Sequence, residues 1–336
     1  MNTLKSILLR REMGILVVII LFCIVVGLIK PRFLAVDNLR VILLLVPLIM
    51  IAAMGEMLVV IARHVDLSVG STLGFAAMMT ALMFKLQPDI PFYLGFPVAI
   101  GIGAVLGLIN GITVIVFRLP AIIVTLGTLY LYRGLTFIAS GAKQIDRQFI
   151  PGPLKAMSAN APNYWLPWIV IIAAVVVLLT YWFANHSRLG RQIYAIGSNP
   201  TAAPLRGIPV AAVTLTVFSI SGALAGLAGI LYASRWGFVN PSNTGWGFEF
   251  QVIAAVVIGG VSINGGVGSV LGVVLGVFLL GCVSAALPLL GIPGTVQSAI
   301  YGLVIIVALV IDQTVRERGI QALTTARGAR TCPPSP

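Results

Sequence analysis

Residues 185–210 read NHSRLGRQIYAIGSNPTAAPLRGIPV, a basic and glycine-punctuated stretch in an otherwise strongly apolar chain. Apolar segments flank the stretch on both sides, which predicts a surface loop between two membrane-spanning helices. Arg188, Arg191 and Arg206 place this loop on the cytoplasmic face, because cytoplasmic loops carry an excess of basic residues. The loop is too long and too patterned for a simple turn. Its centre, residues 200–205, predicts a short helix along the membrane surface, as in a docking element.

The composition of the whole chain is that of an integral membrane protein. Hydrophobic residues make up 59% of the 336 positions and charged residues only 9%, which excludes a soluble globular domain. A helix needs about 20 apolar residues to cross a bilayer. We therefore expect an all-α protein with about ten transmembrane helices and both termini in the cytoplasm. The expected spans are residues 14–29, 40–62, 70–84, 93–116, 120–139, 165–184, 211–233, 248–262, 268–288 and 296–312.

The chain is expected to form one transmembrane domain over residues 14–314, between cytoplasmic tails at 1–13 and 315–336. A short near-repeat, VGSTLG at Val69–Gly74 and VGSVLG at Val267–Gly272, opens two of the apolar segments. Repeated halves are common in transporters, and spans 2–5 and 7–10 are the candidate pair. In a chain with 36 glycines, a chance match is the alternative.

Charge and motif content argue against several classes of function. The net charge of +12 comes from residues scattered over loops and tails, so no nucleic-acid interface is predicted. The three cysteines and two histidines show no metal-ligand spacing, and no serine-nucleophile or zinc-protease motif is present. We therefore predict that the chain is not an enzyme.

The glycine-rich stretch GGVSINGGVGS, residues 259–269, invites comparison with a nucleotide-binding loop. Such a loop needs a lysine after its last glycine, but Gly268 is followed directly by Ser269. The stretch instead predicts a tight turn or a broken helix in which Ser262, Asn264 and Ser269 bind freed backbone groups. No cofactor is expected on this chain.

The first candidate functional residues are Asp66 and Ser68, just before a helix that is expected to begin near Val69. One interpretation is structural, because their oxygens can accept the unpaired N–H groups of that helix. The alternative is a role in translocation or gating, since a carboxylate near the membrane interior is costly. Glu56 lies ten residues upstream and is the one other acid near this position.

Further polar groups lie within the expected spans. Buried Thr side chains often bond only to the carbonyl of the preceding helical turn, and pore lining is the alternative role. An arginine within a span needs a partner, water or the interface. Glu249 is either an acid favoured at a helix start or part of an external gate. The groups concerned are Asn110, Thr125, Thr128, Tyr130, Tyr132, Arg133 and Glu249.

Four stretches, taken together and in order, resemble the ABC sugar permeases of the ribose-permease family. They are Ser187-x-x-Gly190-Arg191 with Tyr194-Ala-Ile-Gly197, Asn199, Ala202-Ala203 and Gly207-Ile208; Val65-Asp-Leu-Ser-Val-Gly70; Leu119-Pro-Ala-Ile-Ile-Val-Thr-Leu-Gly-Thr-Leu129; and Ala254-Ala-Val-Val-Ile-Gly-Gly-Val-Ser262 with Gly265-Gly266. Tyr-Arg-Gly at 132–134 and Gly247-Phe-Glu249 are most similar to the rhamnose and autoinducer-2 branch. Two departures stand in the loop: Thr201 where relatives often carry Glu, and Pro204 where many carry a longer polar residue.

The resemblance implies a permease subunit of an ATP-driven importer in the bacterial inner membrane. Two permeases, identical or related, would form the pore, and two cytosolic ATPase subunits would bind and hydrolyse ATP. A periplasmic or extracellular binding protein would deliver a monosaccharide-type solute: rhamnose, ribose, another pentose or hexose, or autoinducer-2. The loop at 185–210 would couple the permease to its ATPase. The residues implied for coupling are Gly197, Ser198, Asn199, Ala202, Ala203, Arg206, Gly207 and Ile208.

Two alternatives stay open. A branched-chain amino-acid or nucleoside permease of the same superfamily would differ only in its solute. An ion-coupled secondary transporter would need buried acids arranged as a relay, for which Glu56 and Asp66 are the candidates. The secondary transporter does not explain the patterned loop at 185–210.

Overall fold

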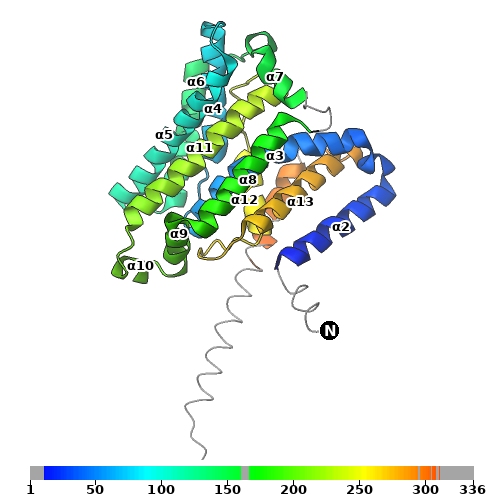
Figure 1. Ribbon diagram of the computed structural model, residues 1–336. Helices are drawn as coiled ribbons and strands as arrows, with labels where there is room; N and C mark the ends of the chain where they lie inside the picture. The colour runs from blue at the N-terminus through cyan, green and yellow to red at the C-terminus, as the bar shows by residue number, and fades with distance from the viewer. Residues whose placement is uncertain (1–10, 160–165, 294–295, 304, 308–309, 311–336) are drawn as a thin grey trace, which may run out of the picture.

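The computed structural model describes residues 11–159, 166–293, 296–303, 305–307 and 310. These residues form helices joined by short links (Figure 1). The α-helices are α2 (Arg11–Ile29), α3 (Val36–Ile61), α4 (Val69–Leu86), α5 (Gly95–Phe117), α6 (Ala121–Ser140), α7 (Gly152–Ala159), α8 (Trp168–His186), α9 (Arg188–Ser198), α10 (Ala202–Leu205), α11 (Val210–Trp236), α12 (Phe248–Ile258) and α13 (Val270–Leu289). Three 3-10 turns add η1 (Pro31–Leu34), η2 (Phe92–Leu94) and η3 (Arg147–Phe149).

Eight helices in the described part of the chain are long and apolar enough to cross a membrane. They are α2, α3, α4, the η2–α5 segment, α6, α8, α11 and α13, and they confirm eight of the expected segments. The expected span at 248–262 is shorter: α12 has 11 residues, or about 16 Å of helix against about 30 Å of hydrocarbon. The expected span at 296–312 and the tails at 1–13 and 315–336 lie partly or wholly outside the described residues.

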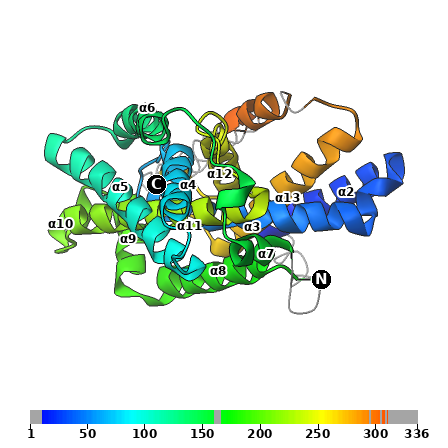
Figure 2. The same cartoon turned by 90° about the horizontal axis from the view of Figure 1, so that it is seen from above.

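The long helices lie side by side as a bundle, with small elements at its two ends (Figure 1). Helices α9 and α10 lie at one end, together with the start of α2, and α7 lies at the other end. Seen from above, α6 and α12 lie on one side of the bundle and α8 lies on the opposite side (Figure 2). The segment at 185–210 and the first described residues of the chain therefore share one end.

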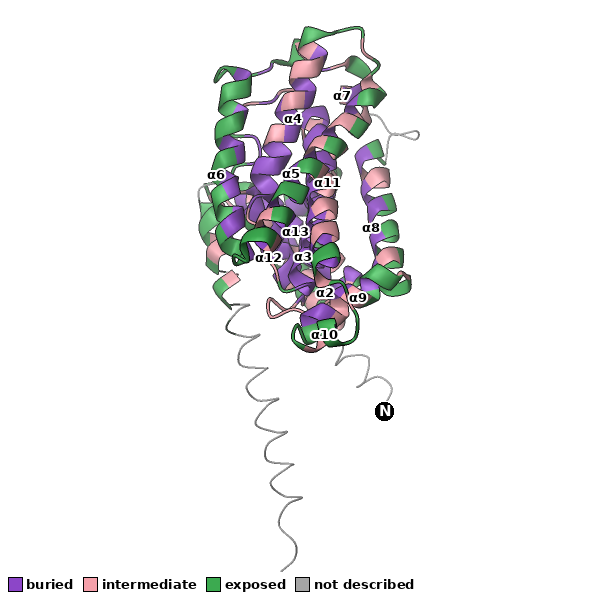
Figure 3. Ribbon diagram, turned by 90° about the vertical axis from the view of Figure 1, so that its left-hand side faces the viewer, coloured by how far each residue is buried: buried purple, intermediate pink, exposed green. Residues whose placement is uncertain are grey.

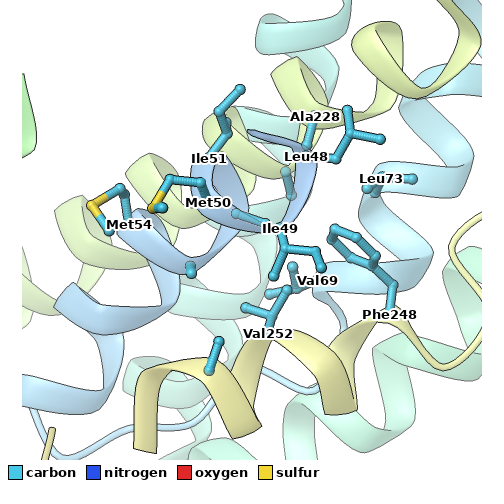
Figure 4. Close-up of a cluster of buried hydrophobic side chains, with 14 of the residues drawn as sticks. Leu48, Ile49, Met50, Ile51, Met54, Val69, Leu73, Ala228, Phe248 and Val252 are labelled. Atoms are coloured by element: carbon cyan, nitrogen blue, oxygen red, sulfur yellow. The ribbon is translucent and has the colours of Figure 1, made fainter. Parts of the chain in front are cut away.

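Helix α3 forms the centre of the bundle. Every residue from Val46 to Ile61 is buried, and α3 packs against α8, α11, α12 and α13. Figure 4 shows Ile49 of α3 near Val69 of α4 and Val252 of α12. The outer sides of α6 and α8 instead expose apolar residues (Figure 3), as a helix does where it faces lipid.

Helices α5 and α11 approach each other closely because glycines line their contact. A Cβ at Gly103 would lie 2.0 Å from the carbonyl oxygen of Gly222, and a Cβ at Gly222 would lie 2.1 Å from the carbonyl oxygen of Gly103. Small residues of this kind let helix backbones approach in a membrane. The contact places Asn110 of α5 inside the bundle, where it reaches the site described below.

Candidate functional site

A buried polar network joins α3, α5, α6 and the link at 62–68. The backbone N–H of Asp66 donates to Oε1 of Glu56 (3.0 Å), and Oγ of Ser68 donates to Oδ1 of Asp66 (2.6 Å). Nδ2 of Asn110 donates to Oγ of Ser68 (2.8 Å), and the hydroxyl of Tyr132 donates to Oδ1 of Asn110 (3.0 Å). Each of these five residues is at most 1% exposed. The network therefore crosses the bundle from α3 to α6.

The network exists because the link at 62–68 folds back along the end of α3. Arg63 has a left-handed φ of +68°, and the N–H of His64 donates to the carbonyl of Val59 (3.0 Å). Asp66 then lies level with Glu56, one and a half turns before the end of α3. Helix α4 consequently begins inside the bundle, where polar side chains replace water as partners for the backbone of the link.

Capping of α4 differs from the expectation. The helix begins at Val69, as predicted, but Ser68 at its N-cap makes no side-chain capping bond. Its hydroxyl donates to Asp66, and Oδ1 of Asp66 also accepts the Ser68 N–H (2.9 Å) in a local turn. The prediction that both oxygens cap α4 was therefore wrong, because each is occupied within the link and by Asn110. Burial raises the pKa of Asp66, while the two bonds from Ser68 act in the opposite direction.

The threonines of α6 bond to carbonyls of their own helix, and Thr125 also contacts the link at 62–68. Oγ1 of Thr125 donates to the carbonyl of Ala121 (2.9 Å), one turn back, and also lies 3.1 Å from the carbonyl oxygen of Val65. Oγ1 of Thr128 donates to the carbonyl of Thr125 (3.3 Å). Thr125 therefore belongs to the network around Asp66, whereas the Thr128 hydroxyl bonds to its own helix.

A second buried cluster lies between α6 and the segment at 237–247. Nη1 of Arg133 donates to the carbonyl of Thr244 (2.6 Å), and its guanidinium lies 5.5 Å from the centre of the Trp246 ring. The partner expected for an arginine in a span is thus a backbone carbonyl together with an aromatic face. Both belong to the segment at 237–247, which descends from the α7 end of the bundle to the start of α12.

Glu249 lies in the first turn of α12, as predicted for a helix-start acid, and is 5% exposed. Its carboxylate fills the space where Gly70 of α4 lacks a side chain: a Cβ there would lie 2.1 Å from Oε2 of Glu249. Gly245 and Gly247 have φ values of +74° and +71°, a region that side-chain-bearing residues rarely adopt. These glycines let the segment press against α4 and aim Glu249 into the bundle.

The basic stretch at 185–210 contains a helix that the sequence reasoning missed. Residues Arg188–Ser198 form α9, and Oγ of Ser187 caps it by accepting the N–H of Gly190 (2.8 Å). The short helix expected at 200–205 is present as α10, capped by Oδ1 of Asn199, which accepts the N–H of Ala202 (3.0 Å). The serine at the N-cap was the signal available for α9.

Helix α9 rests directly on the last residue of α3, Ile61, and on the link between α12 and α13 at 259–269. A Cβ at Gly197 would lie 1.9 Å from the carbonyl oxygen of Ile61 and 2.3 Å from the backbone nitrogen of Gly266. The N–H of Gly266 donates to the same Ile61 carbonyl (2.9 Å), and the Tyr194 hydroxyl donates to the carbonyl of Gly268 (2.9 Å). The end of α3, the start of α13 and α9 therefore meet through backbone atoms.

The other coupling candidates divide into anchored and exposed residues. Ala203 is buried, and its carbonyl accepts the N–H groups of Arg206 (3.1 Å) and Ile208 (3.3 Å). Arg206 and Gly207 are exposed, Gly207 has a φ of +73°, and Leu205 is 88% exposed. Ser198 bonds back to the carbonyl of Tyr194 (2.8 Å). Helix α10 thus presents an apolar tip on an anchored turn.

The glycine-rich stretch forms the turn predicted for it. Oγ of Ser269 accepts the N–H of Gly272 (3.0 Å) and so caps α13. Gly260, Gly265 and Gly266 have left-handed φ values between +75° and +81°. The end of α12 and the start of α13 are therefore joined by a tight link.

Comparison with known proteins agrees with this arrangement. The family described as "Branched-chain amino acid transport system / permease component" matches residues 38–309. "Autoinducer 2 import system permease protein LsrC" of Escherichia coli O9:H4 (strain HS) is 35% identical over 339 residues, covering 99% of this chain and 96% of that protein. The protein of the same description from Enterobacter sp. (strain 638) is 37% identical over 322 residues, covering 96% and 91%.

No solved structure matches the chain significantly. The family match covers most of the chain, and the relatives align with nearly all of it at more than 30% identity. Eight helices of the described residues are long and apolar enough to cross a membrane, as a permease requires. The chain therefore belongs to the branched-chain amino acid transport system permease component family, as a membrane-spanning permease subunit.

Proposed function

We propose that the chain is the permease of an ATP-binding-cassette importer that carries autoinducer 2 or a monosaccharide-type solute into the cytoplasm. The relatives' description as autoinducer 2 import permeases supports this solute class. The observation that carries the proposal is the seating of α9 on the end of α3 and on the link at 259–269 through Gly197. A surface insertion that contacts the end of a central helix and the link before α13 is suited to converting an external force into helix movement.

In this proposal a cytosolic ATPase subunit docks on α9 and α10. The exposed Leu205 offers an apolar contact, and Arg206 beside it offers a cation for an acidic groove. When the ATPase closes on ATP, α9 shifts, and the contact of Gly197 with Ile61 and Gly266 passes the shift to α3, α4 and α13. The ATPase binds the nucleotide, and the permease chain itself takes part only in the movement.

The buried network links this movement to α4 and α5. Buried hydrogen bonds inside a membrane protein are costly to break, so residues joined by them move together. Asp66 and Ser68 lie at the start of α4, and Asn110 connects them to α5. A shift of the link at 62–68 therefore moves the start of α4 together with α5, a concerted movement of the kind that alternating access needs.

The remaining partners follow from the same scheme. A solute-loaded binding protein docks at the end of the bundle that carries α7, opposite α9 (Figure 1). A second permease, either another copy or a related chain, completes the pore. In this scheme both termini lie on the cytoplasmic side of a bacterial inner membrane, because the eight long helices of the described part of the chain, like the ten spans expected from the sequence, are an even number.

Two other functions have specific observations in their favour. The family description itself names branched-chain amino acids, so an amino-acid permease is the nearest alternative. The closeness of Glu56 and Asp66 favours an ion-coupled carrier, because Oε2 of Glu56 is buried and has no hydrogen-bond partner among the residues that the structure describes.

The test is reconstitution of the permease in proteoliposomes with the ATPase and binding protein encoded beside it. We expect ATP hydrolysis that depends on the added ATPase and rises with a solute-loaded binding protein, together with uptake of autoinducer 2 or ribose. Uptake of leucine alone would favour the amino-acid alternative. Uptake by the chain alone, driven by an ion gradient without ATP, would refute the importer.

A further inference from the structure

Two charged side chains that lie against one glycine-lined face of α4 have hydrogen-bonding atoms that are not used. Arg133 of α6 is 7% exposed and Glu249 of α12 is 5% exposed. Nε of Arg133 and Oε2 of Glu249 are buried and have no hydrogen-bond partner within the described part of the chain. No ion pair within 4 Å joins the two residues there. Buried polar atoms are nearly always paired, so these two unpaired atoms indicate that a further partner binds them.

The backbone holds both groups in place. The carbonyl of Thr244, which binds Nη1 of Arg133, lies against Gly74 of α4, where a Cβ would come within 2.7 Å of it. The carboxylate of Glu249 lies against Gly70 in the same way. Since Gly70 and Gly74 are one turn apart on α4, the helix forms a smooth seat for the segment from Thr244 to Glu249. The two charged groups are therefore positioned by α4 and are not loose surface side chains.

An aromatic platform lies beside them. The Arg133 guanidinium lies 5.5 Å from the centre of the Trp246 ring, yet Trp246 remains 66% exposed. Tyr130, one turn before Arg133 on α6, is 65% exposed. Helices α6 and α12 lie on the same side of the bundle with α4 behind them (Figure 2). The exposed ring and the two unused polar atoms therefore belong to one region.

We infer that Arg133, Trp246 and Glu249 form a solute-contact site on the translocation path, and that the site takes a neutral polyhydroxylated solute. A hydroxyl both donates and accepts, so neighbouring hydroxyls satisfy the Arg133 Nε–H donor and the Glu249 carboxylate acceptor together. The C–H face of a compact ring lies on the indole of Trp246, as apolar surfaces do on aromatic side chains. This inference rests on the proposed function and names the residues through which the permease contacts its solute.

The site is closed in the arrangement seen here, because both unused atoms are shielded from solvent. The solute reaches them when the segment at 237–247 shifts away from α6. That shift loosens the bond between Arg133 and Thr244, and the solute replaces it. The site is thus filled only during a transport cycle, which couples occupancy to movement of α12.

The experiment uses the full importer in proteoliposomes, with ribose, 2-deoxyribose, autoinducer 2 and leucine as probes. Three variants are compared: Glu249→Gln, Arg133→Lys and Trp246→Leu. Trp182→Leu is the matched control, because Trp182 on α8 is also exposed (61%) but lies on the opposite side of the bundle. Two quantities are measured for each: solute taken up per ATP hydrolysed, and the uptake ratio of ribose to 2-deoxyribose with one unchanged binding protein.

We expect the three variants to keep stimulation of ATP hydrolysis by the loaded binding protein within about twofold of wild type. Uptake per ATP should fall by about tenfold or more, a factor that corresponds to one lost charge-assisted contact. In Glu249→Gln the uptake ratio of ribose to 2-deoxyribose should move closer to one, because an amide in place of the carboxylate weakens the bond to a hydroxyl. The control should match wild type in both quantities.

The outcomes separate the two proposals. In one outcome, wild type imports a polyol while all three variants equal the Trp182→Leu control in uptake per ATP and in uptake ratio. That result would refute the solute-contact site but leave the proposed importer function intact. If wild type moves leucine and no polyol, the solute class fails together with the proposed function. Trp246→Leu changes an exposed ring, so it remains informative if either charged-residue variant fails to assemble.

Discussion

Gly197 of α9 lies so close to Ile61 of α3 that a Cβ on Gly197 would come within 1.9 Å of the Ile61 carbonyl oxygen. A contact this short leaves no room for any side chain, even that of alanine. Gly266 occupies the other side of the same contact, with its N–H bound to the Ile61 carbonyl. Three segments that are far apart in the sequence thus share one backbone junction at the base of the bundle.

We predict that Gly197→Ala uncouples ATP hydrolysis from uptake. The added methyl forces α9 away from Ile61, and overpacking of this kind costs about 1–3 kcal/mol. Uptake per ATP should fall by about tenfold or more, while membrane insertion stays normal. The matched control is Gly127→Ala in α6, where no atom lies within 4 Å of the added Cβ. Equal coupling in the two variants would remove the junction from the mechanism.

The turn after α10 gives a second prediction. Gly207 has a φ of +73° and open space around it, so a side chain there is limited by backbone strain and not by contacts. Gly207→Val should weaken binding of the ATPase subunit to the permease in detergent, and Gly207→Asn should weaken it much less. Asparagine tolerates the left-handed region, whereas a β-branched residue does not. Pull-down of the ATPase at equal permease expression measures the effect.

Ala203→Phe tests the same docking element from its buried side. Ala203 is 3% exposed and anchors the turn through its carbonyl. A large ring cannot fit there, so we expect α10 to shift and ATPase binding to fall, with the thermal stability of the remaining bundle little changed. Normal transport by this variant would contradict a coupling role for α10.

The buried network predicts a stability effect. Asn110→Leu leaves Oγ of Ser68 without its donor and the Tyr132 hydroxyl with one acceptor fewer. The free energy of unfolding should fall by about 1–3 kcal/mol, the usual cost of unpaired buried polar groups. Thr113→Val on the same helix is the control, since Thr113 is exposed and bonds only within its own helix. Unfolding midpoints in detergent provide the comparison.

The seam between α5 and α11 can be tested with two glycines on one helix. Gly103→Ala places a methyl 2.0 Å from a carbonyl of α11, whereas Gly101→Ala meets no atom within 4 Å. We expect the first substitution to cost about 1–3 kcal/mol of stability. The second should be neutral or stabilising by about 1 kcal/mol, because alanine favours helix over glycine. Similar unfolding curves for the two variants would show that α5 and α11 can move apart enough to fit the added methyl group at little cost.

Much of this architecture follows from hydropathy alone. The central helices are long apolar runs, so α3 and α11 were predicted within a few residues of their ends. Helix α12 was not, because the apolar run at 248–262 continues beyond Ile258 into glycines. Gly259 ends the helix, and Gly260 turns with a φ of +81°. Hydropathy counts apolar residues, but it does not register where the backbone leaves the helical conformation.

The functional residues could be named from the sequence, but their grouping could not. Asp66 and Asn110 were candidates because polar groups in spans are costly, yet 44 positions separate them along the chain. Their junction through Ser68 depends on the fold-back after α3, which no local pattern encodes. Arg133 and Glu249 likewise lie against one face of α4 only because Gly70 and Gly74 make room. Such contacts are set by tertiary packing, which single-sequence patterns do not specify.

The junction at Gly197 has a further consequence for how force travels through the molecule. Side chains in contact can change rotamer and so absorb a small displacement, whereas main-chain atoms in direct contact have no such slack. Helix α9 touches the last residue of α3 and the link before α13 through main-chain atoms. A displacement of α9 by a fraction of an ångström therefore also displaces the end of α3 and the link before α13, because rotamer changes cannot absorb it at these contacts.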